Sequence, residues 1–172
     1  MTENDSRIEE SPLFGTIISW LKSENWSYEI IPDKQAIRTG VQGRNSAYKV
    51  FFRVQEDKQQ IHLFLAVEQK VPENKRDEAA EYLMRATWGL QIGNFEFDYS
   101  DGEFRYKVAY DVENGRFSTR MVKNMVGISL GTFDRYFPGL MAVTFANVSP
   151  QTAISQVESP ASNSAAQDGE AS

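Results

Sequence analysis

The chain has 172 residues, of which 41% are hydrophobic, and this is long enough for one domain with a substantial buried core. The formal net charge of −6 and the scattered Lys and Arg residues argue against nucleic acid or an anionic membrane as a partner, and the absence of cysteine excludes disulfides and cysteine metal sites. The N-terminus is polar and acidic and no apolar run approaches the roughly 18–20 residues that span a bilayer, so we expect a cytoplasmic protein without a membrane segment.

The first half of the chain predicts one helix followed by strands. Residues 1–10 are expected to be a disordered lead. Ser11 is a good N-cap and Pro12 suits the first helical position, where its missing N–H costs nothing, so a helix should run from there to about Asn25. After a short extended piece we expect three strands with turns between them, at 35–42, 47–55 and 60–68.

The second half predicts a helix, a hairpin and a last helix. Apolar residues recur with helical spacing over about 72–90, and a hairpin should occupy about 92–111. The last helix should begin after Ser118 and continue to about Tyr136. Phe137 precedes a proline and is therefore pushed out of the α region, so a break or kink is expected there.

The C-terminal segment, 148–172, has the composition of a disordered tail. It is acidic, rich in Ser, Ala and Gln, and contains no Lys or Arg, so it buries too little apolar surface to offset its conformational entropy. A single folded domain is therefore expected at 11–147. Its element order is α-β-β-β-α-β-β-α, with an optional short strand at 28–31. Such an order predicts an α+β fold, a mainly antiparallel sheet with helices packed on it.

The segment FEFDYSDGEFRYKV, 95–108, predicts a hairpin with one aromatic face and one charged face. Asp101-Gly102 is a preferred dipeptide of the two-residue type I′ turn, because both positions need a positive φ. We expect the aromatic face to be covered by the helices and the charged face to meet water. The turn predicts the pairs Tyr99–Phe104, Phe97–Tyr106 and Phe95–Val108 on one face, and Asp98–Arg105 and Glu96–Lys107 on the other.

No residue pattern identifies a reaction. His62 is the only histidine, and strand alternation directs it to the open face of the sheet, as a polar surface residue rather than a base or metal ligand. Glu96 and Asp98 have basic cross-strand partners and Asp101 is explained by the turn, so catalytic carboxylates are not favoured. The glycines of TGVQGRN, 39–45, match neither a dinucleotide fingerprint nor a phosphate loop. We expect no catalytic residue, no cofactor and no metal.

Excess apolar surface is the more informative feature. In strands 47–55 and 60–68 the core-facing residues leave Phe51 and Phe64 on the face expected to meet water, which indicates that this face is partly covered. The last helix is apolar around too wide an arc for one neighbour, and its glycines permit close approach to its own sheet or to a second subunit. The candidate interface residues are Phe51, Phe64, Met121, Met125, Gly127, Ile128 and Gly131.

Two segments resemble the YbjN-domain family. These are PENKRDEAAEYLMRATWGLQIGNFEFDYSDGE, 72–103, and FDRYFPGL, 133–140. The likeness lies especially in Leu83, Arg85, Leu90, Gly93, Phe95, Asp98, Asp101, Gly102 and Glu103. The element order resembles the fold of type III secretion chaperones, which this family shares.

The resemblance implies a sensory or regulatory factor without catalytic residues. The related chaperones are homodimers that bind extended effector segments, so the resemblance also implies a tendency to dimerise. The long acidic tail departs from such compact domains.

Three functions stay open at this point. The chain could be a non-enzymatic protein-interaction module, chaperone-like or regulatory, which binds a protein or peptide as a homodimer. It could instead be a small-ligand sensor or enzyme with a pocket between sheet and helices, or a structural subunit of a larger complex. A narrow, filled layer between sheet and helices would favour the first function, and a polar-lined cavity containing His62 or buried carboxylates would favour the second.

Overall fold

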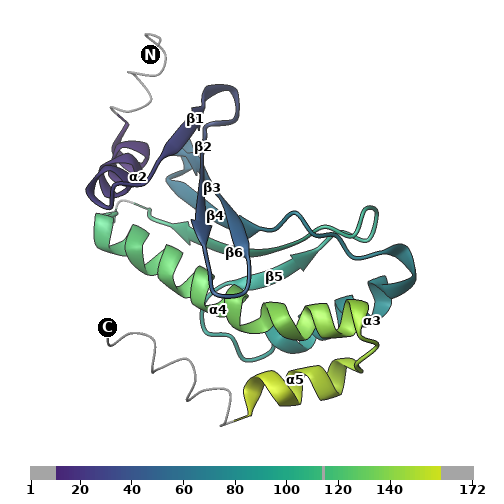
Figure 1. Cartoon of the computed structure of the whole chain (residues 1–172). Helices are drawn as coiled ribbons and strands as arrows, with labels where there is room; N and C mark the ends of the chain where they lie inside the picture. The colour runs from purple at the N-terminus through teal and green to yellow at the C-terminus, as the bar shows by residue number, and fades with distance from the viewer. Residues whose placement is uncertain (1–10, 114, 160–172) are drawn as a thin grey trace.

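Alternating buried and exposed residues along the strands build one antiparallel sheet (Figure 1). The computed structural model describes residues 11–113 and 115–159. Six strands lie in the order β1-β2-β3-β4-β6-β5, and every neighbouring pair is antiparallel. The strands are β1 (Tyr28–Ile31), β2 (Ala36–Gln42), β3 (Ala47–Gln55), β4 (Gln60–Ala66), β5 (Asn94–Phe97) and β6 (Phe104–Asp111).

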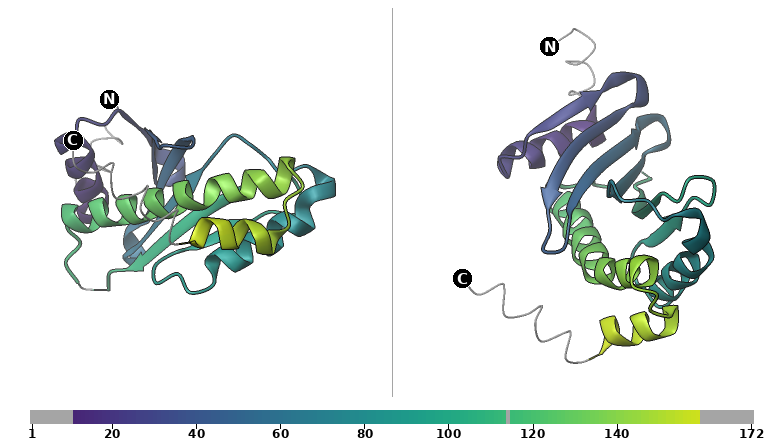
Figure 2. Two further views of the ribbon diagram at one scale, coloured as in Figure 1. Left: turned by 60° about the horizontal axis from the view of Figure 1, so that its bottom comes forward. Right: turned by 45° about the vertical axis from the view of Figure 1, so that its right-hand side comes forward.

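The helices lie on one side of this sheet (Figure 2). They are α2 (Pro12–Ser23), α3 (Arg76–Thr87), α4 (Thr119–Phe145) and α5 (Pro150–Glu158), and single 3-10 turns lie at Pro32–Lys34, Glu56–Lys58 and Glu73–Lys75. Of these helices, α5 packs on α3 and α4. The predicted α+β class and element order are confirmed, and the optional strand at 28–31 forms as the edge strand β1.

One face of the sheet is covered by helices and the other is not (Figure 2). Val50, Phe52, Leu63 and Leu65 point to the helices and are fully buried. The residues that alternate with them point away, to a face that no helix of the described chain covers. We call this second face the open face.

The aromatic face of the hairpin is covered, as predicted. Phe104 and Tyr106 are buried from solvent, and Phe133 of α4 packs against the hairpin. The ring centroid of Phe133 lies 5.5 Å from that of Phe95 and 5.9 Å from that of Phe104. Edge-to-face ring contacts of this kind add to the free energy gained by burial.

The predicted hairpin register is wrong by two residues. Phe97 pairs with Phe104, and Phe95 pairs with Tyr106. The connection is longer than the expected two residues, because the Asp98 N–H donates to the Glu103 carbonyl at 2.8 Å. Gly102 has φ +78 but Asp101 has no positive φ, so the turn is not type I′. A shift of two residues keeps every side chain on its predicted face.

Helix α4 is not broken at Phe137, which corrects the predicted helix end. Pro138 lies inside the helix, where its missing N–H leaves the Asp134 carbonyl without its helical donor. The side-chain amide of Asn45 donates to this carbonyl instead, at 2.8 Å. The helix therefore continues to Phe145, and the freed carbonyl ties it to the β2–β3 turn.

The expectation of disorder over 148–172 is wrong for Pro150–Glu158, which form α5. Ser149 caps this helix by accepting from the Thr152 N–H at 3.2 Å, and a proline follows the cap. Helix α5 packs against α3 and α4, where Ala153 is buried and the Tyr136 hydroxyl donates to Glu158 at 2.9 Å. The expected lead at 1–10 and the remainder of the tail lie outside the described residues.

Deleting residues 149–172 should lower the free energy of unfolding by about 1–3 kcal/mol, because α5 covers apolar surface of α3 and α4. Urea unfolding of the two truncated chains measures this effect. Deletion of 160–172 alone is the matched control and should leave the midpoint nearly unchanged. Equal midpoints for both truncations would show that α5 contributes nothing to the folded domain.

Candidate interaction surfaces

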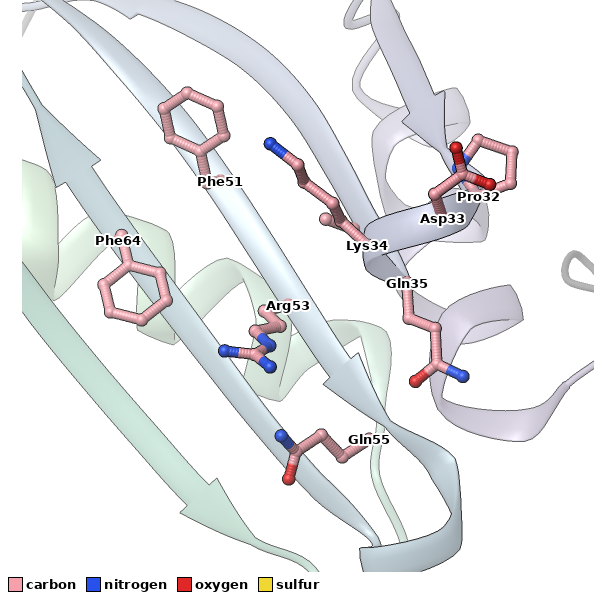
Figure 3. A pocket seen from close by; sticks show the side chains of 9 residues that line it. Pro32, Asp33, Lys34, Gln35, Phe51, Arg53, Gln55 and Phe64 are labelled. Carbon is pink, nitrogen blue, oxygen red and sulfur yellow. The ribbon is translucent and has the colours of Figure 1, made fainter.

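The register places two aromatic side chains together on the open face. Phe51 of β3 lies directly opposite Phe64 of β4, and both are half-buried (Figure 3). A shallow recess of about 600 Å³ runs beside them to the 3-10 turn at Pro32–Lys34, and Arg53 also lines it. The two phenylalanines thus lie where the sequence predicted them, on the face turned away from the helices.

Basic side chains surround this aromatic pair. The Arg105 guanidinium lies over the ring of Phe64 at 4.4 Å, and the His62 ring stacks on the same phenylalanine at 6.2 Å. In the described chain, neither Lys34 nor Arg53 forms an ion pair. The middle of the open face therefore combines apolar rings with positive charge, although the whole chain is acidic.

His62 is a polar residue of this face, as expected. Burial lowers the pKa of His62, and the charges of Lys107 and Arg53 lower this pKa further. Its Nδ1 atom has no hydrogen-bond partner among the described residues, so the structure provides no group that would orient the ring as a base. In the same residues, no cluster of three His, Asp or Glu side chains could hold a metal ion.

One of the interface residues predicted on the last helix is wrong. Met125 is fully buried in the core of the domain, so it cannot contact a partner. Met121 and Ile128 are half-buried, whereas Gly127 and Gly131 are exposed. A Cβ atom added at either glycine would meet nothing within 4 Å, so these glycines do not serve to seat the helix on its own sheet. The wide apolar arc of α4 is explained by its contacts with the sheet and with the other helices.

A second apolar surface was not predicted from the sequence. Met84 and Trp88 are 72% and 89% exposed, although both belong to the apolar residues that recur with helical spacing over about 72–90. Helix α3 ends at Thr87, and Trp88 has the extended backbone angles φ −60 and ψ 121. The helical period therefore no longer sets the direction of the Trp88 side chain. A correct prediction of this helix end would have removed Trp88 from the predicted apolar side of the helix.

A buried carboxylate was also missed. Asp134 of α4 is 8% exposed and accepts hydrogen bonds from the backbone N–H groups of Arg44 and Asn45, at 3.1 and 2.9 Å. It also accepts from the Tyr48 hydroxyl at 2.8 Å. Burial, and then this hydrogen bond, raise the pKa of Tyr48. The carboxylate oxygens thus accept hydrogen bonds from the β2–β3 turn, which identifies a structural role for Asp134.

Comparison with known proteins agrees with this fold. The YbjN family model, described as "Putative bacterial sensory transduction regulator", matches residues 15–141. The chain belongs to the YbjN family. The crystal structure of YbjN, a "putative transcription regulator" from E. coli, superposes with a TM-score of 0.55 at 13% identity and covers 80% of this chain and 93% of that chain. At this identity the similarity of the two YbjN-family proteins shows the fold alone.

A second solved structure, the HopA1-SchA chaperone-effector complex, matches this YbjN-family chain with a TM-score of 0.44 and 12% identity. The match covers 78% of this chain and 96% of that chain. No curated protein sequence matches. None of the helices in the described ranges combines the length and apolar character that crossing a membrane requires.

Proposed function

We propose that this YbjN-family chain is a non-enzymatic protein-interaction module, chaperone-like or regulatory, which binds a protein or peptide partner as a homodimer in the cytoplasm. The observation that carries the proposal is the Phe51–Phe64 pair on the open face. Uncovered apolar groups gathered on one surface usually mark an interface. Soluble oligomers are most often two-fold dimers, in which the same surface of both copies meets.

The position of the pair suits a two-fold interface. Strands β3 and β4 are the two central strands of the sheet, so an axis near Phe51 and Phe64 would cover the middle of the open face in both copies. Several cations of this face are already neutralised within one chain. Glu96 accepts from Arg105 at 2.7 Å and from Lys107 at 2.9 Å. This pairing reduces the repulsion that two like surfaces would otherwise experience.

The layer between sheet and helices supports the interaction module over a ligand sensor or enzyme. Ile17, Leu63 and Phe133 belong to one hydrophobic cluster in this layer and have no exposed surface, which is the packing expected of a filled core. The buried carboxylate of Asp134 is held by the β2–β3 turn, and His62 lies on the other side of the sheet.

Light scattering across a range of concentrations tests the homodimer. The wild type should show the mass of two 19.5 kDa chains at micromolar concentration. The double variant Phe51→Glu with Phe64→Glu should show one chain, with an unchanged circular dichroism spectrum, because a buried carboxylate without a partner opposes association. Phe145→Glu, at a 63% exposed position on α4, is the matched control and should stay dimeric.

Two outcomes would contradict the proposal in different ways. A wild-type mass of one chain at every concentration would exclude the homodimer. A folded double variant that is still dimeric would exclude the open face as its interface. If the double variant unfolds, Phe51 and Phe64 are core residues, which also counts against this interface. Met125 is unsuitable for such a test, because a charge at this buried position would unfold the domain.

A further inference from the structure

A shallow recess lies on the open face, between the Phe51–Phe64 pair and the 3-10 turn at Pro32–Lys34 (Figure 3). We call it the open-face recess. Its open volume of about 600 Å³ lies in the range of sites that hold small molecules. The recess lies across the sheet from the filled layer under the helices, so a ligand could enter it without disturbing the core.

The two phenylalanine rings give the recess an aromatic wall. Phe51 and Phe64 are cross-strand partners, and both are half-buried. The Arg105 guanidinium lies over the Phe64 ring at 4.4 Å. Aromatic rings in stacked or edge-on contact contribute free energy beyond that of the buried area. This wall therefore favours a flat aromatic ligand over an aliphatic one.

Unpaired positive charge is concentrated beside the recess. Arg53 lines it from β3 and Lys34 lines it from the turn. Among the described residues, neither of them forms an ion pair. The other Lys and Arg residues on the open side of the strands each pair with a carboxylate of the same chain, and these are Arg38, Lys49, Arg105 and Lys107. The recess is thus the part of the open face where an anion finds cations that are not already neutralised.

The lining also sets the charge of the ligand. Asp33 is the one acidic residue of the described lining, so Arg53 and Lys34 leave one net positive charge. Figure 3 shows the Lys34 side chain extending toward Phe51, while Asp33 extends away from it. An Arg guanidinium can bind a carboxylate through two parallel hydrogen bonds. A singly charged carboxylate therefore fits this recess better than a doubly charged phosphate.

The turn that carries Lys34 is held against the sheet. The Gln35 N–H donates to the Pro32 carbonyl at 3.0 Å, and the Gln35 carbonyl accepts from the Val54 N–H at 2.9 Å. The second of these hydrogen bonds joins the turn to β3 next to Arg53. A recess whose walls are already ordered loses little conformational entropy when a ligand binds.

We propose that the open-face recess binds a small aromatic carboxylate. The ring of this ligand lies against Phe51 and Phe64, and its carboxylate pairs with Arg53 and Lys34. Because the recess is shallow and open, the smallest such ligands should bind with a Kd of about 1 mM, and larger ones more tightly.

The ligand and a second copy of the chain compete for the same two rings. This inference deepens the proposed function, because it supplies a means of regulating the homodimer. The competition rests on the open face being the dimer interface, whereas the ligand site does not, since one chain provides all of its lining. A ligand that binds only the uncovered face shifts the equilibrium toward the monomer.

Binding of cinnamate, a flat aromatic carboxylate, tests the recess. Thermophoresis of the labelled full-length chain at nanomolar concentration measures the Kd, because a dimer of micromolar affinity is dissociated there. Cinnamamide has the same shape without the charge, and octanoate has the charge without the ring. Each should bind about tenfold more weakly than cinnamate. All titrations are done at one ionic strength, because salt screens exposed charges.

Three variants locate the ligand. Arg53 is exposed, and Arg53→Gln should raise the Kd of cinnamate about tenfold while leaving that of cinnamamide unchanged. Phe64→Leu should raise the Kd of cinnamate severalfold and leave that of octanoate nearly unchanged. Lys49→Gln is the matched control, because it removes a positive charge from the same strand and face outside the recess, and it should leave the Kd of cinnamate unchanged.

Three results would overturn the ligand site. The first is an absence of saturable binding of cinnamate. The second is an equal affinity for cinnamate and cinnamamide. The third is an equal effect of Arg53→Gln and Lys49→Gln on the Kd of cinnamate.

Light scattering with cinnamate separates the ligand site from the homodimer. At micromolar protein concentration, cinnamate should lower the mass of the wild type from two chains toward one, and cinnamamide should do so less. A monomeric wild type that binds cinnamate would remove the dimer and keep the ligand site. A dimeric wild type that binds no cinnamate when diluted would do the opposite. An unchanged dimer mass at saturating cinnamate would overturn the competition.

Discussion

Replacing Asp134 with alanine should lower the free energy of unfolding by about 3 kcal/mol or more. The carboxylate bridges α4 and the β2–β3 turn, which are far apart in the sequence. Alanine would leave the N–H groups of Arg44 and Asn45 and the hydroxyl of Tyr48 without their acceptor in a largely buried place. Each unsatisfied buried donor costs more free energy than an ordinary hydrogen bond contributes.

Urea unfolding measures this loss, and two variants make it specific. Asp134→Asn keeps the shape and one acceptor oxygen, so it should lose less stability than Asp134→Ala. Asp111→Ala removes an exposed carboxylate and should change the free energy of unfolding by less than about 0.5 kcal/mol. A loss at Asp134→Ala as small as that at Asp111→Ala would show that the α4–turn connection contributes little to stability.

Replacing Gly102 with valine should destabilise the domain by about 3 kcal/mol, for two reasons that add. Its φ of +78 strains any residue with a branched side chain. An added Cβ would also overlap the carbonyl oxygen of Val71 and lie 3.0 Å from its carbonyl carbon. The segment before α3 is held here, because the Val71 N–H donates to the Gly102 carbonyl at 3.0 Å.

A substitution at Gly89 separates the cost of the positive φ from the cost of the overlap with Val71. It has a similar φ of +83, but an added Cβ would meet nothing within 4 Å. Gly89→Ala should therefore cost only the conformational strain, about 1 kcal/mol, and Gly102→Ala should cost clearly more. Thermal unfolding followed by circular dichroism compares the two variants. Equal melting temperatures would show that the contact with Val71 is not tight in solution.

The strands and the sides of the sheet could be predicted because strand alternation is a local signal. The hairpin register could not, because the Asp98 side chain accepts from the Ser100 N–H at 2.8 Å and favours a longer connection than Asp101-Gly102 alone suggests. Helix α5 could have been predicted from Ser149 and the proline that follows, the same signal that marked α2. The Ser-, Ala- and Gln-rich composition of the tail led instead to the prediction of disorder.

Contacts between segments that are distant in the sequence leave no local pattern from which they could be predicted. Glu56 caps α2 by accepting from the N–H groups of Leu13 and Phe14, both at 2.9 Å, although Ser11 was the predicted cap. The candidate interface residues show the same difference between local patterns and contacts of distant segments. Phe51 and Phe64 follow from alternation along their strands. The burial of Met125 depends on the packing of the whole helix, so it could not be predicted from a local pattern.

Hydroxyl-radical footprinting at two protein concentrations tests most directly whether the open face is the dimer interface. Oxidation of Phe51 and Phe64 should be strong in dilute solution and clearly weaker in concentrated solution, because a second copy covers them. Trp88, which is 89% exposed and lies away from this face, should be oxidised equally at both concentrations. Equal oxidation of Phe51 and Phe64 at the two concentrations, with the Trp88 reference unchanged, would contradict the proposed interface.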